Sequence, residues 1–391
     1  MQRERFGHRP AIRSMRVIAV TGTSGKTTTT WLTAAALAEA GHPVGVLSDL
    51  GCLAPGDRQP IASAYGSRLG LAAWLGQFAE AGCSHAVVEV SQRMLANDLL
   101  ADLDLDTLVI TNHAAGRLAA RGSRRLAAGD PAAAVAALQP GGVLVTGCDA
   151  RARARLEQRL AADCHVVTAG LADDCDVRAT AVEGNLFGRT LLVSSGGQLA
   201  ALALGAPVVS FVRDSLLAAA VGGRYGIPLE VAVRGIESAG GVPGRVERLD
   251  MGQEAAIFLD SPTSGHALAT TLASLRRLTR GRLVVIAEEP LVERIGGGRF
   301  GPLVARHCDG CIVAPVTVLA DDPADADVAA YARIDRLLES LGPDDCGLVL
   351  GGVGRSGTRP PAPAGRFALA MLARAWLQIS QAPAPADRRA A

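Results

Sequence analysis

The sequence of 391 residues lacks the features that mark several large classes of protein. Its formal net charge is only +1 at pH 7, so nothing in it favours a nucleic-acid partner. It contains no run of about 18 apolar residues, so no segment is predicted to span a membrane. The basic first residues are followed by neither an apolar core nor a cleavage site, so no secretory signal is predicted.

The cysteines also lack a pattern that would predict a zinc site. Eight cysteines are scattered along the chain. Cys308 and Cys311 form one Cys-x-x-Cys pair, but no second pair occurs at similar spacing. We therefore expect reduced thiols and a cytoplasmic location.

Lysine is almost absent as well. Of the 39 basic residues, 38 are arginine, and the one lysine is Lys26. A chain that uses arginine everywhere else indicates a need for a compact ammonium group at this position. A planar guanidinium would not fit a phosphate cradle in the same way.

Lys26 lies in a stretch that is typical of phosphate-binding loops. Residues 17–20 predict a buried strand, a glycine-bracketed turn follows at 22–25, and residues 31–40 predict a helix. The backbone N–H groups of such a loop and the positive end of the helix dipole point at one anion. Lys26 would add a charge for the β- and γ-phosphates, and Thr27 would add a hydroxyl for Mg²⁺.

The loop has the shorter Gly-Thr-x-Gly-Lys-Thr form, because the full eight-residue pattern would need glycine where Val20 stands. An ordinary glycine turn is the alternative, but strand, loop and helix all fall where phosphate binding requires them. We therefore predict that the loop binds the phosphates of ATP. The predicted nucleotide contacts in the loop are Gly22, Thr23, Ser24, Gly25, Lys26, Thr27 and Thr28.

Apolar runs alternate with segments rich in alanine and leucine from residue 15 onward, which predicts an α/β fold with a mostly parallel sheet. The expected strands are 16–21, 43–48, 85–90, 107–111, 142–146 and 165–168, and the expected helices are 25–40, 67–81, 129–139 and 150–161. Short runs between glycine turns then predict an antiparallel patch. These runs are 177–182, 186–193 and 199–204, and helices are expected after them at 211–223 and 229–238.

A glycine-rich segment at 238–244 predicts a hinge, and a second, smaller α/β unit is expected beyond it. Its expected strands lie near 254–259, 282–287, 311–314 and 347–350, and its expected helices near 264–279, 300–307 and 324–341. The last part of the chain is expected to hold a loop at 355–365, an amphipathic helix at 366–380 and a disordered tail at 382–391.

Polar side chains follow two of the predicted strands at the edge where open parallel sheets bind ligands. Glu89 and Ser91 end one strand, and Glu89 would hold Mg²⁺ directly or through water. A glutamate bonded to a neighbouring loop is the alternative, but the phosphate loop on the same sheet favours the metal role. Thr111 and Asn112 would either line the same crevice or begin an ordinary turn.

Polar residues also follow the hinge. Arg245, Glu247 and Asp260 would close over a nucleotide held by the first domain. Taken alone, a solvated arginine–glutamate pair explains them better.

Together and in this order, these segments resemble the Mur ligase family, and within it the enzymes that add the third residue to the UDP-muramyl dipeptide. The phosphate loop, the Glu-Val-Ser strand and the Pro-Gly-Arg-x-Glu hinge form a specific combination. The likeness covers about residues 15 to 354 and lies in 17–30, 81–91, 107–112, 141–145, 242–247 and Asp260, and more weakly in 335–336 and 348–354.

The resemblance implies a P-loop-type, ATP-binding central domain with a mostly parallel sheet at residues 15–241. It implies a smaller, Rossmann-like C-terminal domain at 242–381, with a polar lead-in at 1–14 and a tail at 382–391. The implied chemistry is ATP-dependent amide synthesis from a small-molecule carboxylate and an amine. The carboxylate takes the γ-phosphoryl group to form an acyl phosphate, and the amine then displaces phosphate, leaving ADP.

The resemblance also assigns roles to residues. Lys26 and Glu89 would act in catalysis, and Thr27 and Glu89 would hold Mg²⁺. Phosphoryl transfer needs positioning and charge neutralisation more than covalent help, which suits this set of groups. The further residues implied to bind ATP are Asp214, Arg245 and Asp260.

The sequence departs from the family pattern in its metal and substrate motifs. Only about 15 residues precede the loop, where the family has a UDP-binding domain, so a UDP-sugar held in the usual way is not expected. The Asp-His pair after Thr-Asn is replaced, and His113 stands at a different spacing. The family's carbamylated lysine cannot form, because Lys26 is the one lysine.

The second domain departs from the pattern too. Its usual Asp-Tyr-Ala-His-Asn-Pro motif survives only as residues 260–265, and the Asp-Asn-Pro-Arg motif is absent from 314–323. Near the positions of the family's adenine-contacting asparagines, the chain has Phe211 and Asp214.

Three functions remain open at this point. A divergent ligase is favoured, because five residues match the family pattern: Lys26, Thr27, Glu89, Arg245 and Asp260. A pseudo-ligase that binds ATP and serves as a partner or regulatory subunit of another protein is the alternative, since loss of a metal ligand slows such chemistry by orders of magnitude. The third is an unrelated P-loop ATPase or kinase, for which only 121–125 could supply an arginine-rich lid.

Overall fold

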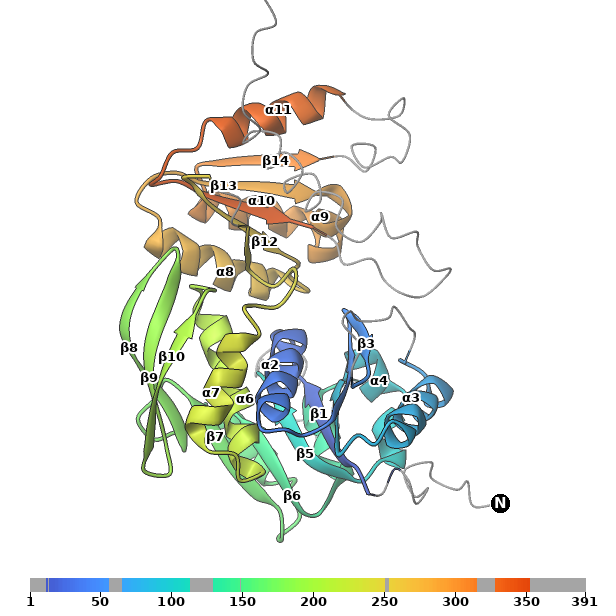
Figure 1. The fold of residues 1–391 in the computed structure, drawn as a ribbon. Coiled ribbons are helices and arrows are strands. Elements are labelled where there is room, and N and C mark those ends of the chain that lie inside the picture. The colour runs from blue at the N-terminus through green and yellow to red at the C-terminus, as the bar shows by residue number, and fades with distance from the viewer. Residues whose placement is uncertain are drawn as a thin grey trace, which may run out of the picture. The chain divides into compact units, whose positions relative to one another are not determined.

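The computed structural model describes residues 12, 14–55, 65–112, 129–147, 149–249, 253–314 and 328–351. The chain forms two compact units, the first of which runs to Val242, while the second begins at Pro243 (Figure 1). None of the helices in these ranges is both long enough and apolar enough to cross a membrane.

One sheet of ten strands runs through the described part of the first unit. The strands are β1 (Arg16–Thr21), β2 (Val44–Ser48), β3 (Gly51–Leu53), β4 (His85–Glu89), β5 (Leu105–Ile110), β6 (Leu138–Thr146), β7 (His165–Gly170), β8 (Val177–Asn185), β9 (Gly188–Ser195) and β10 (Gln198–Leu204). Their order is β10-β9-β8-β7-β6-β5-β1-β4-β2-β3. The strands from β2 to β8 in this order pair in parallel, whereas β3 on one side and β9 and β10 on the other pair antiparallel.

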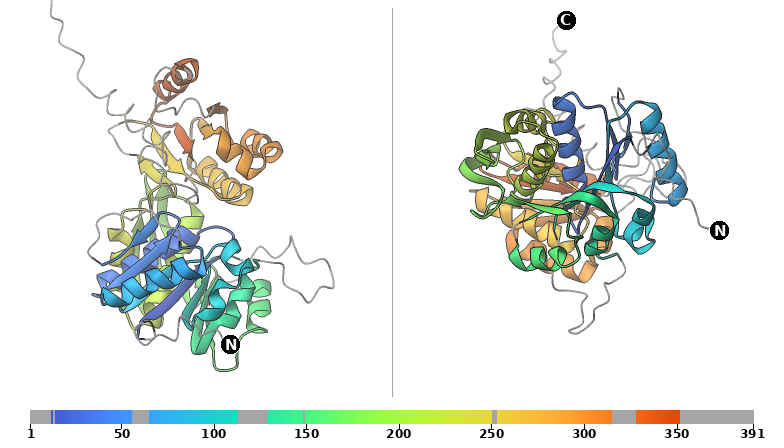
Figure 2. Two further views of the ribbon diagram at one scale, coloured as in Figure 1. Left: turned by 90° about the vertical axis from the view of Figure 1, so that its right-hand side faces the viewer. Right: turned by 90° about the horizontal axis from the view of Figure 1, so that it is seen from below.

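Helices cover both faces of this sheet, because its central strands are apolar and buried on both sides. The helical segments are α2 (Lys26–Glu39), α3 (Arg68–Glu80), α4 (Gln92–Ala96), η2 (Leu99–Asp102), η3 (Pro131–Ala137), α5 (Ala150–Glu157), α6 (Val209–Arg224) and α7 (Leu229–Ser238). Helices α2, α6 and α7 pack on one another on one face, and α3 lies on the opposite face (Figures 1 and 2).

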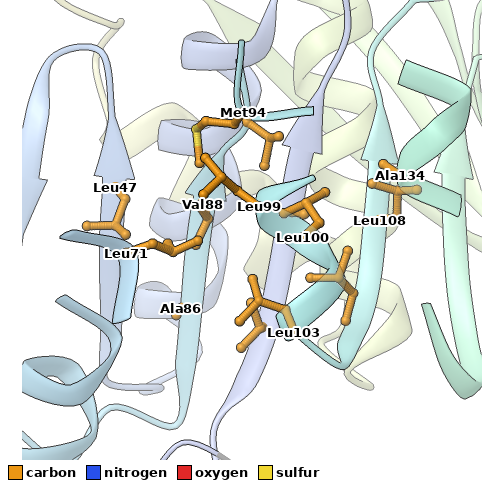
Figure 3. Close-up of a cluster of buried hydrophobic side chains, with 14 of the residues drawn as sticks. Leu47, Leu71, Ala86, Val88, Met94, Leu99, Leu100, Leu103, Leu108 and Ala134 are labelled. Carbon is orange, nitrogen blue, oxygen red and sulfur yellow. The ribbon is translucent and has the colours of Figure 1, made fainter. Parts of the chain in front are cut away.

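The core on the α3 face holds leucines from strands, helices and 3₁₀ turns together (Figure 3). Leu71 of α3 and Leu108 of β5 are fully buried there, and Met94 of α4 and Leu100 of η2 nearly so. Burying a side chain of this size stabilises a fold by about 1.5–3 kcal/mol relative to leaving it exposed. The core includes residues of β1, β4 and β5, the strands at whose ends the predicted site residues lie.

Both outer strands of this sheet are shielded or short. The backbone N–H of Ala203 in β10 donates to the Oε1 atom of Glu237 in α7, at 2.7 Å, and α7 packs along β10. At the other edge, β3 has only three residues and begins with Gly51.

The described part of the second unit is a smaller α/β fold (Figure 1). Its strands are β11 (Glu247–Leu249), β12 (Ala256–Asp260), β13 (Leu283–Glu288), β14 (Gly310–Ala314) and β15 (Cys346–Leu350), and its helices are α8 (Gly265–Leu278), α9 (Glu289–Ile295), α10 (Gly297–His307) and α11 (Val328–Glu339). The sheet order is β11-β12-β15-β13-β14. All pairs are parallel except the one between β11 and β12.

The predicted α/β class with a mostly parallel sheet is confirmed, and the antiparallel patch is present as β8, β9 and β10. The helix expected at 129–139 is present as the 3₁₀ helix η3 rather than as an α-helix, and it is shorter than expected. Asp130 caps the N–H of Ala132, a 3₁₀ segment follows, and the chain enters β6 at Leu138, which pairs with Leu105. The segments at 355–365, 366–380 and 382–391 lie outside the described residues.

The cysteines differ in part from expectation. The free thiols are Cys52, Cys83, Cys164, Cys308, Cys311 and Cys346. Cys175 is disulfide-bonded, and its partner lies outside the described residues. The expectation of reduced thiols is therefore wrong for Cys175.

Candidate functional site

The predicted loop follows β1, the strand between β4 and β5, and leads into α2. Gly22 and Gly25 both have positive φ angles, 142° and 79°, which favour glycine. A Cβ atom on Gly22 would lie 2.1 Å from the Oγ1 atom of Thr111, and one on Gly25 would lie 2.3 Å from the Oδ1 atom of Asp214. The glycines are therefore required both by the backbone conformation and by the close approach of other side chains.

No side chain of the N-cap residue or of the first turn of α2 competes with an anion for the N–H groups at this helix end. Gly25 is the N-cap residue and supplies no side-chain hydrogen bond to the helix end. The first turn also carries no acidic residue. The N–H groups at such an end carry a partial positive charge, which favours a phosphate.

Thr111 and Asn112, which directly follow the neighbouring strand β5, hold the loop. The Oδ1 atom of Asn112 accepts the backbone N–H of Thr23 at 2.9 Å and that of Ser24 at 3.3 Å. Its Nδ2 atom donates to the carbonyl oxygen of Ser24 at 3.1 Å, and the hydroxyl of Thr111 donates to the same oxygen. These two residues thus support the shape of the loop, rather than only beginning a turn.

Glu89 lies beside the loop because β4 pairs with β1, placing Glu89 opposite Val20. The hydroxyl of Thr27 donates to the Oε1 atom of Glu89 at 3.1 Å, and the backbone N–H of Asp49 donates to its Oε2 atom at 3.0 Å. Glu89 is only 1% exposed. The structure therefore brings Thr27 and Glu89, the two predicted metal ligands, into direct contact.

Two neighbours of Glu89 were not foreseen from the sequence. The hydroxyl of Tyr65 donates to the backbone oxygen of Glu89 at 3.0 Å. Burial, followed by the charges of Glu89 and Asp49, raises the pKa of Tyr65 well above its ordinary value, so this side chain stays a neutral donor. Asp49 could have been found, since it follows directly on β2 at the same edge of the sheet.

Asp214 of α6 lies on the other side of the loop. Its carboxyl group lies against the backbone of Gly25, and the residue is 7% exposed. Burial raises the pKa of Asp214 well above its ordinary value, whereas the Thr29 hydroxyl and the charge of Arg213 act in the opposite direction. Phe211, one turn earlier, is 4% exposed.

Arg245 and Asp260 form a separate cluster within the second unit. The Oδ1 atom of Asp260 accepts the N–H groups of Val246 at 3.3 Å and Ser261 at 3.0 Å, and the hydroxyl of Thr271 donates to its Oδ2 atom at 3.3 Å. The Arg245 guanidinium donates to the carbonyl oxygen of Ser261. Burial raises the pKa of Asp260, and the positive charge of Arg245 opposes that rise.

The structure therefore divides the predicted residues into two groups. The loop residues, Glu89 and Asp214 lie together in the first unit, while Arg245 and Asp260 lie together in the second. His113, the stretch at 121–125 and residues 315–323 lie outside the described part of the chain.

The donor set beside the loop suits a hard cation. Thr27 and Glu89 offer oxygen atoms, which Mg²⁺ prefers. In the described ranges, no group of three or more His, Cys, Asp or Glu side chains could hold a metal ion. A cation at this pair would therefore take its other ligands from phosphate oxygens and water, as is usual for Mg²⁺.

Known proteins resemble this chain in sequence. A family model described as "Mur ligase middle domain" matches residues 20–222. The UDP-N-acetylmuramoyl-L-alanyl-D-glutamate–2,6-diaminopimelate ligase of Thermosynechococcus vestitus is 28% identical over 349 residues, covering 86% of this chain and 67% of that protein. For eight such relatives, the chain spans from 37% to 67% of the relative's length.

Solved structures resemble the chain in fold. A UDP-N-acetylmuramoyl-L-alanyl-D-glutamate–2,6-diaminopimelate ligase matches with a TM-score of 0.63 at 20% identity, over 86% of this chain and 72% of that one. A bifunctional folylpolyglutamate synthase/dihydrofolate synthase, solved with Mn, AMPPNP and L-glutamate bound, matches with a TM-score of 0.60 at 17% identity, over 89% of this chain and 90% of that one.

Proposed function

Because this chain belongs to the Mur ligase family, we propose that it is a divergent ATP-dependent ligase that joins a small-molecule carboxylate to an amine and releases ADP and phosphate. The observation that carries the proposal is the contact between Thr27 and the buried Glu89 beside a glycine loop at a helix N-terminus.

The roles proposed for the loop follow from its chemistry. The ammonium group of Lys26 and the N–H groups at the start of α2 would face the phosphates of ATP. Transfer of the γ-phosphoryl group to the carboxylate forms an acyl phosphate, and the charge that builds up on the oxygens needs fixed positive partners. Thr27 and Glu89 would hold Mg²⁺, which supplies additional charge neutralisation when bound.

By its family resemblance, residues 15–241 would form an ATP-binding central domain and residues 242–381 a C-terminal domain. Asp214, Arg245 and Asp260 would contribute to ATP binding. The names of the relatives favour a peptidoglycan precursor as substrate. A cytoplasmic location is proposed as well, because ATP is available there.

A pseudo-ligase is the second candidate, and one observation favours it. Lys26 is the one lysine and is committed to the loop, so no lysine remains to be carbamylated and bridge a second metal ion. On this alternative the protein binds ATP without turnover and acts through a protein partner.

The test is the release of ADP and phosphate from Mg-ATP by the purified protein, with pools of amino acids and peptidoglycan precursors. Release that requires both a carboxylate and an amine supports the ligase. Tight ATP binding without turnover in any pool supports the pseudo-ligase instead. Lys26→Ala should abolish nucleotide binding, whereas Arg151→Ala, which removes a positive charge from the exposed face of α5, should not. Unchanged ATP affinity in Lys26→Ala would refute both candidates.

A further inference from the structure

The carboxyl group of Asp214 lies beside the proposed nucleotide site, where the phosphates of a bound nucleotide would bring negative charge. The group lies so close to Gly25 that a Cβ atom there would be 2.3 Å from one carboxyl oxygen and 2.8 Å from the other. Gly25 is the residue from which α2 begins. A phosphate bound at this helix end would therefore lie near an acid that belongs to a different helix.

The surroundings of Asp214 supply little compensation for a negative charge. Among the described residues, the Thr29 hydroxyl and the exposed Arg213 favour ionisation, and burial outweighs them. The elements packed on α6 carry other charged or titratable residues: Lys26 and Glu39 in α2, His165 in β7, Arg178 and Glu183 in β8, and Glu230, Arg234 and Glu237 in α7.

Most of these residues are engaged elsewhere. Arg178 bonds the Ser194 hydroxyl and the Asp173 carbonyl oxygen. Glu237 bonds the backbone N–H of Ala203. Arg234 forms ion pairs with Glu39 and Glu230, and Glu183 accepts from the Thr190 hydroxyl. Lys26 follows Gly25 in the chain, and in the proposed function its ammonium group would pair with the phosphates of the nucleotide rather than with Asp214.

We propose that nucleotide binding to the loop is coupled to the uptake of one proton by Asp214, so that this residue positions the loop as a neutral acid in the bound state. The inference rests on the proposed function, because it requires a nucleotide in the loop. The proton comes from solvent and resides on a carboxyl oxygen of Asp214; no other bond changes. An ionised carboxylate would repel the incoming phosphates, whereas a protonated one removes the repulsion and adds a donor.

Thermodynamic linkage between proton binding and nucleotide binding predicts how the nucleotide affinity depends on pH. If a bound nucleotide favours the protonated form of Asp214, protonation must favour the nucleotide by the same factor. Affinity should then fall as the pH rises through the range in which free Asp214 loses its proton. The fall attributable to Asp214 can reach about tenfold per pH unit, the limit for one proton.

The experiment is calorimetric titration of the full chain with Mg-ADP between about pH 5 and pH 9, in pairs of buffers that differ in ionisation enthalpy. ADP has its own titration, so the measured quantity is the difference between the wild type and Asp214→Asn at each pH. The amide keeps the shape of the side chain and cannot take up the proton. Asp174→Asn is the matched control, since it removes a carboxylate from the exposed turn before β8.

We expect the wild type and Asp174→Asn to lose affinity more steeply with pH than Asp214→Asn, and to take up more protons on binding. Equal slopes and equal proton uptake in all three proteins, with binding intact, would overturn this inference alone. No binding by any of them at any pH would overturn the proposed function and this inference with it. Should Asp214→Asn fail to fold, Asp214→Ser serves in its place and is judged by the same difference in proton uptake.

Discussion

Acid should destabilise the first unit through one histidine. His85 is the first residue of β4 and is 5% exposed. Its ring packs against the rings of His42 and Tyr225, and each of these ring centroids lies 4.6 Å from that of His85. Burial lowers the pKa of His85 from 6.5 to about 4; the charges of His42 and Arg16 act in the same direction, whereas that of Asp106 opposes them. The folded protein therefore keeps this ring uncharged at a pH where the unfolded chain would protonate it.

The direction and the size of the change in unfolding free energy with pH follow from the difference in the pKa of His85 between the folded and unfolded states. The unfolded state binds the extra proton, so the stabilising contribution is complete above about pH 6.5 and is lost as the pH falls toward about 4. A drop in pKa from 6.5 to about 4, at about 1.4 kcal/mol per unit, limits the loss of unfolding free energy to about 3.5 kcal/mol. That is a large fraction of the stability of an ordinary domain.

Urea unfolding at a series of pH values measures this loss. Trp31 and Trp74, two of the chain's three tryptophans, belong to the first unit and report its unfolding by fluorescence. His85→Phe keeps a ring in place but cannot titrate, so its unfolding free energy should fall less between neutral pH and pH 4 than that of the wild type. His165→Phe, the same change at an exposed position, should behave like the wild type. The reasoning is refuted if His85→Phe loses as much stability over this range as the wild type.

Three further predictions concern the loop, the metal pair and the second unit. Gly25→Ala should abolish nucleotide binding because its Cβ atom would meet Asp214, whereas Gly41→Ala has a similar φ of 83° with nothing within 4 Å and should leave the affinity unchanged; equal affinities in both would contradict the steric argument. Glu89→Gln should weaken the binding of Mg-ATP far more than that of metal-free ATP, and an equal loss in both titrations would leave Glu89 with a structural role only. Ser264→Ala removes the cap on the Ala267 N–H and should lower the unfolding free energy of the second unit by about 0.5–2 kcal/mol in a urea titration, so an unchanged midpoint would count against the cap.

The parts of the fold that depend on contiguous residues could be predicted from the sequence. β1, the loop and α2 are contiguous, and an apolar run, a glycine turn and a helical run suffice to find them. Short elements such as β3, α4 and η2 were not predicted, because three to five residues carry no measurable period. The strand at Leu138 depends on its pairing with Leu105, which no local pattern reveals.

The candidate site divides in the same way. Lys26 and Thr27 follow from the loop itself, and Glu89 follows from its place at a strand end. The bonds from Asn112 to the loop and the approach of Asp214 to Gly25 join residues far apart in the sequence. Only the order of the strands and the packing of α6 on α2 bring such residues together.

The edges of the large sheet bear on how the first unit behaves at high concentration. An exposed edge strand offers free N–H and C=O groups to which a strand of another molecule can add. Here Glu237 occupies the N–H of Ala203 along β10, and β3 offers only three residues at the opposite edge. Strand addition between molecules is therefore opposed at both edges, and a variant that loses the Glu237 contact should aggregate more readily while its nucleotide affinity stays the same.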